Sequence, residues 1–230
     1  YTSLVLAGPK SRDVLAAASR GDWSAQGFPW LSVRRTIVGV APAVVMSVSF
    51  SGELAYEIHV PNAQLYAAYL ALRKVGEAHG LRLFGSYAGE SMRLEKGYRH
   101  WKADLVTEFN PFETGLSRFF KMDKPTFIGK PALEKVVATG PCRAFVSMVV
   151  DATHATTHGD DSILADWRVV GSVTSVAWGH RVGKTIAMGF VEPGYAAKGT
   201  RLMVEVVGQP TAATVVPDCL YDPENLRVRA

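Results

Sequence analysis

The 230-residue sequence contains only two cysteines, and this scarcity limits the chemistry that thiols can provide. Cys142 and Cys219 lie far apart, so they form neither a redox-active Cys-x-x-Cys pair nor the closely spaced ligands of a structural zinc site. Two cysteines in a chain of this size are typical of a protein in a reducing compartment. We expect two buried free thiols, with a single disulfide as the alternative.

Long apolar runs and a strong excess of one charge are also missing. No stretch approaches the roughly 18 apolar residues that a membrane helix needs, and no charged leader precedes an apolar segment. Lys and Arg total 25 against 21 Asp and Glu, which gives a net charge of +4. The only basic clusters are Arg34-Arg35 and Arg99–Lys102, and no RNA-binding motif accompanies them. We therefore expect neither a membrane nor a nucleic acid as partner, whereas the small positive charge suits an anionic small ligand.

Several cofactor and catalytic motifs are absent. No Gly-x-Gly-x-x-Gly follows a predicted strand, and no Gly-x-Ser-x-Gly occurs, so neither a dinucleotide site nor a hydrolase nucleophile is predicted here. Residues 179–185 look like a phosphate-binding loop, but they lack one residue between the glycines, and strand-type residues follow. His154 and His158, near Asp160 and Asp161, lie in a segment that Thr and Gly make a polar loop rather than a helix. No metal site is predicted.

The first part of the chain alternates between strand and helix patterns. Apolar and polar residues alternate at 46–51 and again at 56–60, which predicts a β-hairpin. Helical periodicity with end signals occurs in segments 9–18, 62–80, 88–96 and 131–138. Asn110-Pro111-Phe112-Glu113 has the pattern of a capping box.

After Gly140-Pro141 the pattern changes to short β-branched segments separated by Gly and Pro. They cover residues 143–152, 168–178, 184–191, 201–207 and 212–216. Such spacing predicts a small barrel or sandwich. We therefore expect an α+β domain over residues 1–139, followed by a small all-β barrel domain over residues 140–230.

Three segments carry a family resemblance. Ser49–Ile58, Met92–Gly97 and Ala187–Val191 resemble the folate-binding aminomethyltransferases, which include the glycine-cleavage T-protein and the folate domains of dimethylglycine and sarcosine dehydrogenases. The resemblance implies an aminomethyltransferase-type fold over essentially the whole chain, with tetrahydrofolate as cofactor. It also implies that Glu57, on the strand after a Ser-Gly-Glu turn, accepts two hydrogen bonds from the pterin ring, a bidentate mode of recognition.

Further positions favour the dehydrogenase-linked branch of this family. Phe50 replaces a tyrosine of the T-protein and Gly89 replaces its folate-contacting arginine, whereas Gly97–Leu105 and Trp178–Lys184 are similar to the dehydrogenases. The resemblance thus implies one-carbon transfer from a methylated amine such as dimethylglycine or sarcosine to tetrahydrofolate. The FAD of that branch belongs to an upstream flavoprotein domain or subunit. Besides Glu57, the candidate cofactor-binding residues are Phe50, Tyr56 and Arg227.

The sequence opens without Met, so we expect it to lack an N-terminal part of the domain. The resemblance places the catalytic aspartate of the family upstream of residue 1, so no catalytic residue is named, and the fragment alone is expected to be inactive. Glu53 and His100 are candidates to line the cavity, although a histidine beside Trp101 is more often packed or simply exposed. A free-standing aminomethyltransferase and a non-catalytic folate-binding regulatory module remain alternatives. The expected location is the cytoplasm, or the mitochondrial matrix in a eukaryote.

Overall fold

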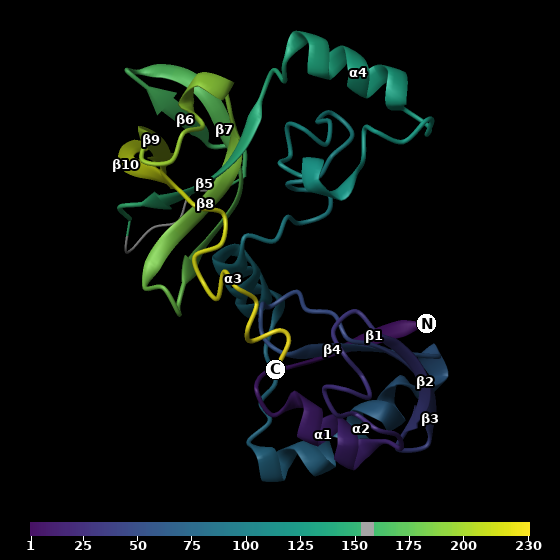
Figure 1. Ribbon diagram of the computed structural model, residues 1–230. Coiled ribbons are helices and arrows are strands. Elements are labelled where there is room, and N and C mark those ends of the chain that lie inside the picture. Colours follow the sequence, from purple (N-terminus) through teal and green to yellow (C-terminus); the bar gives the residue numbers. More distant parts are fainter. Residues whose placement is uncertain (153–158) are drawn as a thin grey trace. The chain divides into compact units, whose positions relative to one another are not determined.

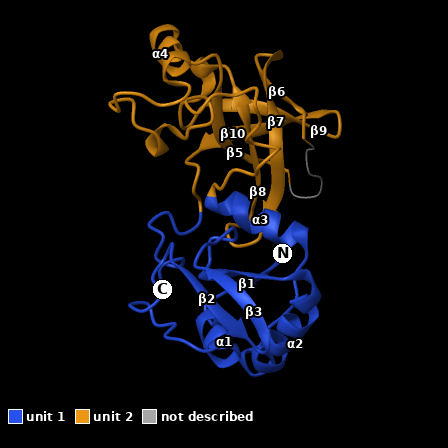
Figure 2. Ribbon diagram, turned by 90° about the vertical axis from the view of Figure 1, so that its right-hand side faces the viewer, with its two compact units in different colours: residues 1–96, 221–230 blue, residues 97–220 orange. Residues whose placement is uncertain are grey.

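The computed structural model describes residues 1–152 and 159–230, which form two compact units. The first unit comprises residues 1–96 and 221–230, and the second comprises residues 97–220 (Figure 2). The second unit thus begins before the domain boundary that the sequence pattern places between residues 139 and 140. That domain boundary stays a prediction. His154 and His158, considered above as metal ligands, lie outside the described residues.

The first unit contains a four-stranded antiparallel sheet with the order β1-β4-β3-β2 (Figure 1). Its strands are β1 (Thr2–Ala7), β2 (Val33–Val38), β3 (Ala41–Met46) and β4 (Ala55–Val60). One face packs against α1 (Ser11–Ala18) and α2 (Leu65–Gly76), which also contact each other. Because alternate residues of a strand point to opposite faces, every second residue of β4 enters this core. The other face of the sheet bears exposed residues, among them Ser3, Val5 and Val33.

The remaining helices of the first unit begin and end close to the predicted positions. Short 3₁₀ turns precede and follow α2, namely η1 (Asn62–Gln64) and η2 (Glu77–His79), and Gly80 ends η2 with φ 77°. The helix predicted from about residue 88 to residue 96 is α3 (Ser86–Lys96). Gly97 stops it with φ 75°, a left-handed conformation that glycine adopts without a steric penalty.

The predicted hairpin is present, but its first strand is wrong in extent. Strand β3 ends at Met46, which pairs with Glu57 of β4, and the alternating residues 47–51 belong to the connecting loop. Ser47 instead exchanges backbone hydrogen bonds with the segment before β2, from Leu31 N–H to Ser47 O and from Ser47 N–H to Ser32 O. The serine-rich alternation therefore reflects an extended loop with other backbone partners.

The second unit contains a closed barrel with the strand order β10-β5-β8-β7-β6-β9, which confirms the predicted all-β barrel. Its strands are β5 (Ala144–Val150), β6 (Ser162–Ala165), β7 (Arg168–Gly179), β8 (Lys184–Val191), β9 (Arg201–Val206) and β10 (Gln209–Val216). The sequence pattern missed β6, whose four residues are too few to show a clear alternation. Within the described part of this barrel the only helical turn is η4 (Pro193–Tyr195). Residues 180–183, within the segment 179–185 that looked like a phosphate-binding loop, connect β7 to β8.

The chain that precedes the barrel is mostly irregular and contains η3 (Ser117–Phe119) and α4 (Lys130–Thr139). The predicted capping box is formed, because Asn110 N–H donates to Glu113 Oε2 and Glu113 N–H donates to Asn110 Oδ1, but only a turn follows it. Cys142 and Cys219 are free thiols, and the expectation that both are buried is wrong, because Cys142 is exposed. Among the described residues, no helix is both long and apolar enough to cross a membrane.

Candidate functional site

Two polar side chains of β4 lie on the face of the sheet that α1 and α2 do not cover. Along β4, Tyr56 and Ile58 are completely buried on the helix-covered face, whereas Glu57 and His59 point the other way. The side chain of Glu57 is 34% exposed and that of His59 is 29% exposed. A carboxylate in this position is accessible to a ligand but only partly hydrated, which strengthens any hydrogen bond that it accepts.

Glu57, His59 and Ser3 form a hydrogen-bonded chain across β4 and β1. His59 Nε2 lies 3.2 Å from Glu57 Oε2, and His59 Nδ1 lies 2.7 Å from Ser3 Oγ. The strand register places Ser3 directly opposite His59, and Val5 opposite Glu57. The contact is therefore built by the sheet itself rather than by a loop.

Apolar side chains surround this polar chain on the same face. Met46 pairs with Glu57 and Val44 pairs with His59 on the neighbouring strand β3. On the next strand, β2, Val33 is opposite Met46 and Arg35 is opposite Val44. Arg35 therefore lies about 10 Å from His59, since neighbouring strands are roughly 4.8 Å apart. One carboxylate among apolar neighbours is suited to select a ligand with a flat apolar body and paired N–H groups.

The Ser-Gly-Glu turn before β4 is held by the end of α3. Gly52 has φ 76°, and a Cβ added there would lie 2.9 Å from Cγ and Cδ of Lys96, so a larger residue fits neither the backbone conformation nor the space. Ser49 Oγ accepts a hydrogen bond from Gly52 N–H at 3.0 Å. Glu53, a candidate to line the cavity, accepts a hydrogen bond from Tyr221 O–H at 2.8 Å. One of its oxygens therefore binds the C-terminal segment, residues 221–230.

A buried ion pair also joins the end of α3 to the C-terminal segment. Lys96, whose side chain is 1% exposed, donates to Asp222 Oδ2 at 2.9 Å. Burial by itself would raise the pKa of Asp222. Hydrogen bonds from Lys96 and from the backbone N–H groups of Arg227 and Leu226 lower this pKa by more than burial raises it. The pKa of Asp222 therefore lies below its usual value, and the residue is ionised at neutral pH.

The other candidate residues are placed differently from Glu57. Tyr56 is wholly buried, with its ring stacked on Phe28 at 6.1 Å between centroids. Phe50 lies in the loop before β4 with 37% of its surface exposed, and the Arg227 side chain is exposed near the C-terminus. His100 belongs to the second unit, where its backbone N–H donates to the buried Asp104 at 2.7 Å. Of the candidates, only Glu57 lies within this hydrogen-bonded chain.

Sequence reasoning missed His59 and Ser3. The period of two along a strand contained the signal for His59, because a residue two positions after Glu57 must share its face. Ser3 gave no such signal, since its position opposite His59 depends on the register between β1 and β4.

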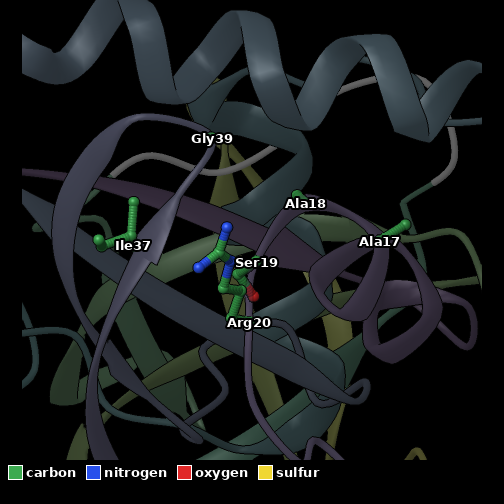
Figure 3. A pocket seen from close by; sticks show the side chains of 6 residues that line it. All are labelled: Ala17, Ala18, Ser19, Arg20, Ile37 and Gly39. Atoms are coloured by element: carbon green, nitrogen blue, oxygen red, sulfur yellow. The ribbon is translucent and has the colours of Figure 1, made fainter.

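A surface hollow also lies in the first unit, at the end of α1 (Figure 3). It is lined by Ala17, Ala18, Ser19, Arg20, Ile37 and Gly39. Arg20 is its only charged side chain, and it lies beside the carboxyl end of a helix, where the backbone dipole disfavours anions. Ser3, His59 and Glu57 do not line this hollow, and its lining residues do not form a recognisable catalytic arrangement.

Comparison with known proteins now identifies the family. Residues 1–124 match the GCVT N-terminal domain, and residues 143–222 match the glycine cleavage T-protein C-terminal barrel domain. Together these matches cover most of the chain, and the second coincides with the barrel of the second unit. The chain belongs to the glycine-cleavage T-protein, or aminomethyltransferase, family.

Similar proteins include two dehydrogenases. The chain is 32% identical over 227 residues to the mitochondrial dimethylglycine dehydrogenase of Homo sapiens, covering 98% of this chain and 26% of that protein. It is 35% identical over 236 residues to the mitochondrial sarcosine dehydrogenase of Mus musculus, covering 98% of this chain and 25% of that protein. The chain thus spans about a quarter of the length of these relatives. The crystal structure of a glycine cleavage system aminomethyltransferase T from Bartonella henselae has the same fold, with a TM-score of 0.55 at 16% identity over 99% of this chain and 84% of that one.

Proposed function

We propose that this chain binds tetrahydrofolate and supports transfer of a one-carbon unit to it from an N-methyl amine. We further propose that it acts as the C-terminal part of a flavin-linked demethylating dehydrogenase or oxidase. Family membership supports the folate, and the similarity to dimethylglycine and sarcosine dehydrogenases supports the methylated amine and an upstream flavoprotein partner. The observation that carries the proposal is Glu57, a half-buried carboxylate on the open face of the sheet.

The surroundings of Glu57 fit a pterin ring. Within the described residues, Glu57 Oε2 accepts a hydrogen bond from His59, and Oε1 has no protein donor, so the carboxylate retains acceptor capacity for a ligand. A carboxylate facing two parallel N–H groups forms a planar bidentate pair. Val5 and Met46, which flank Glu57 in the register, provide apolar contact for the ring.

The cofactor, when bound, supplies the amine nitrogens that capture the one-carbon unit. The role of this chain is to bind and orient the cofactor. A fixed carboxylate holds the pterin in one register, and holding two reactants in register removes much of the entropic barrier to their reaction. Since no catalytic residue is assigned in this chain, Glu57 is a binding residue in this proposal.

The alternative is a free-standing aminomethyltransferase, which shares the fold of the Bartonella protein. Both functions need the folate site, so the donor distinguishes them. Folate-dependent turnover of an aminomethyl carrier without a flavin would favour the alternative. Folate binding with neither activity in the complete protein would instead indicate a regulatory binding module.

The substitution Glu57→Gln tests the folate site. It keeps the shape of the side chain but places an amide N–H₂ against a pterin N–H, so one charged hydrogen bond of about 1.5–3 kcal/mol is lost. We expect tetrahydrofolate affinity to fall roughly ten-fold to a few hundred-fold, since 1.4 kcal/mol is a factor of ten. Calorimetric titration of tetrahydrofolate into both proteins measures this change.

Glu77→Gln is the matched control, because Glu77 is an exposed carboxylate of the same unit. It should leave affinity unchanged, and neither substitution should move the Tm by more than a few degrees. Equal affinity of the wild type and Glu57→Gln would overturn the assignment of this site.

A further inference from the structure

We propose that His59 is a positioning residue for Glu57, fixing the carboxylate in the orientation that receives the pterin. This inference rests on the proposed function and adds a residue that acts through Glu57. The hydrogen-bonded chain from Ser3 through His59 to Glu57 carries it.

The chemistry of the three groups determines the direction of the hydrogen bonds. An ionised carboxylate only accepts, so the His59 nitrogen that faces it, Nε2, must carry the proton. In the neutral ring Nδ1 then has a free lone pair, and it accepts the hydroxyl proton of Ser3. The Glu57 carboxylate therefore fixes the tautomer of His59, and the Ser3 hydroxyl, which can donate, holds the other side of the ring.

The benefit of this chain is preorganisation. A free glutamate side chain loses rotamer freedom when a ligand fixes it, and that loss opposes binding. His59 lies on the same strand as Glu57 and contacts Oε2, so it restrains the side chain before the ligand arrives. Because each carboxylate oxygen has two lone pairs, the bond to His59 leaves both oxygens able to accept from a ligand.

Neighbouring charges do not account for the arrangement. The side chains that flank the pair on β1 and β3 are Val5, Val44 and Met46, none of which titrates. The charged residue on the same face of β2 is Arg35, two strands from His59. On this face the group positioned to hold Glu57 is therefore His59.

Two substitutions of His59 separate positioning from general structural support. In His59→Gln the amide N–H₂ lies near the position of Nε2 and still donates to Glu57, whereas in His59→Asn the side chain is too short to reach it. We expect His59→Asn to weaken tetrahydrofolate binding roughly three- to ten-fold, the effect of one hydrogen bond, and His59→Gln to stay within about two-fold of the wild type. Calorimetric titration into the 230-residue chain provides the affinities.

A double-mutant cycle with Glu57→Gln makes the test specific. If His59 acts through Glu57, His59→Asn should cause no further loss once Glu57 has been replaced. An equal loss in both backgrounds, or a His59→Gln variant as weak as His59→Asn, would overturn the positioning role while leaving the folate site intact.

A second readout needs no ligand. The ¹⁵N chemical shifts of the imidazole nitrogens report the tautomer, and the His59 signals among the six histidines are those that disappear in His59→Asn. We expect the Nε2-protonated tautomer in the neutral ring of the wild type and a mixture of tautomers in Glu57→Gln, whose amide can either donate to His59 or accept from it. An Nδ1-protonated ring in the wild type would overturn the inference even if folate binds. Absence of tetrahydrofolate binding by the wild type, with the expected tautomer present, would instead overturn the proposed function and the role that depends on it.

Discussion

Tyr56 and Glu57 are adjacent in sequence and have opposite environments. Glu57 reaches the open face of the sheet, whereas the Tyr56 side chain enters the core beside Phe28 and beneath Arg12. The Tyr56 hydroxyl is buried and has no hydrogen-bond partner among the described residues. Burial raises the pKa of Tyr56, with the Arg12 charge opposing the shift, so the phenol stays neutral. A buried hydroxyl without a partner carries a desolvation cost that a phenylalanine would avoid.

Tyr56→Phe should therefore leave the protein as stable as the wild type or stabilise it by up to about 1 kcal/mol. Tetrahydrofolate affinity should not change, because the hydroxyl lies on the face opposite to Glu57. Urea unfolding and calorimetric titration check the two expectations. A loss of folate affinity without a loss of stability would instead restore Tyr56 as a ligand-binding residue.

At the scale of secondary-structure elements, a glycine allows two strands of the barrel to pack closely. Gly189 of β8 pairs with Val173 of β7, and β7 contains a register shift between Val173 and Ser175. A Cβ at Gly189 would lie 2.2 Å from the backbone oxygen of Ser172, too close for any side chain. The glycine thus permits the two strands to approach at the irregularity, which is a common role of glycine within sheets.

Gly189→Ala should destabilise the barrel by roughly 2–3 kcal/mol or more, because the contact is with backbone and the strands must separate to relieve it. The matched control is Gly194→Ala, since a Cβ at Gly194 meets nothing within 4 Å and its φ is not positive. Urea unfolding of both variants gives the comparison. Equal stability of the two would show that β7 and β8 can separate at little cost.

At the scale of the whole molecule, the chain returns to its first unit after completing the barrel. Residues 221–230 belong to the unit of residues 1–96, and polar contacts attach them. Tyr221 N–H donates to Glu95 O, Tyr221 O–H donates to Glu53, and Lys96 binds Asp222. The Arg12 guanidinium also donates to the backbone oxygen of Ala230 at 2.6 Å. Within this attachment, the hydrogen bonds and the ion pair of Asp222 depend on its ionised state.

We expect acid to release the C-terminal segment before the rest of the fold. The pKa of Asp222 is lower in the folded state than the value near 3.9 of an unfolded chain, so its contribution to stability is complete above about pH 5. The contribution then declines as the pH falls through the unfolded and then the folded pKa. Hydrogen exchange of the Leu226 and Arg227 amides, which both donate to Asp222, should accelerate in this range relative to barrel amides.

Asp222→Asn should show the fast exchange already at pH 7, because the neutral amide loses the charge interaction with Lys96. Asp123→Asn, at an exposed position of the second unit, is the control and should change nothing. Unchanged protection of Leu226 and Arg227 in Asp222→Asn would show that the contacts of Tyr221 suffice to hold the segment.

The sequence by itself determined the class of fold, the barrel, most helix ends and the family, because periodicity, glycine positions and motifs are local properties of the chain. It also indicated Glu57 as a candidate, through the resemblance of residues 49–58 to a known family. Only the tertiary structure decided that Ser3 and His59 accompany Glu57, that the strand before the turn stops at Met46, and that Lys96 binds Asp222. These features depend on strand register and on contacts between residues distant in the chain, which no local pattern encodes.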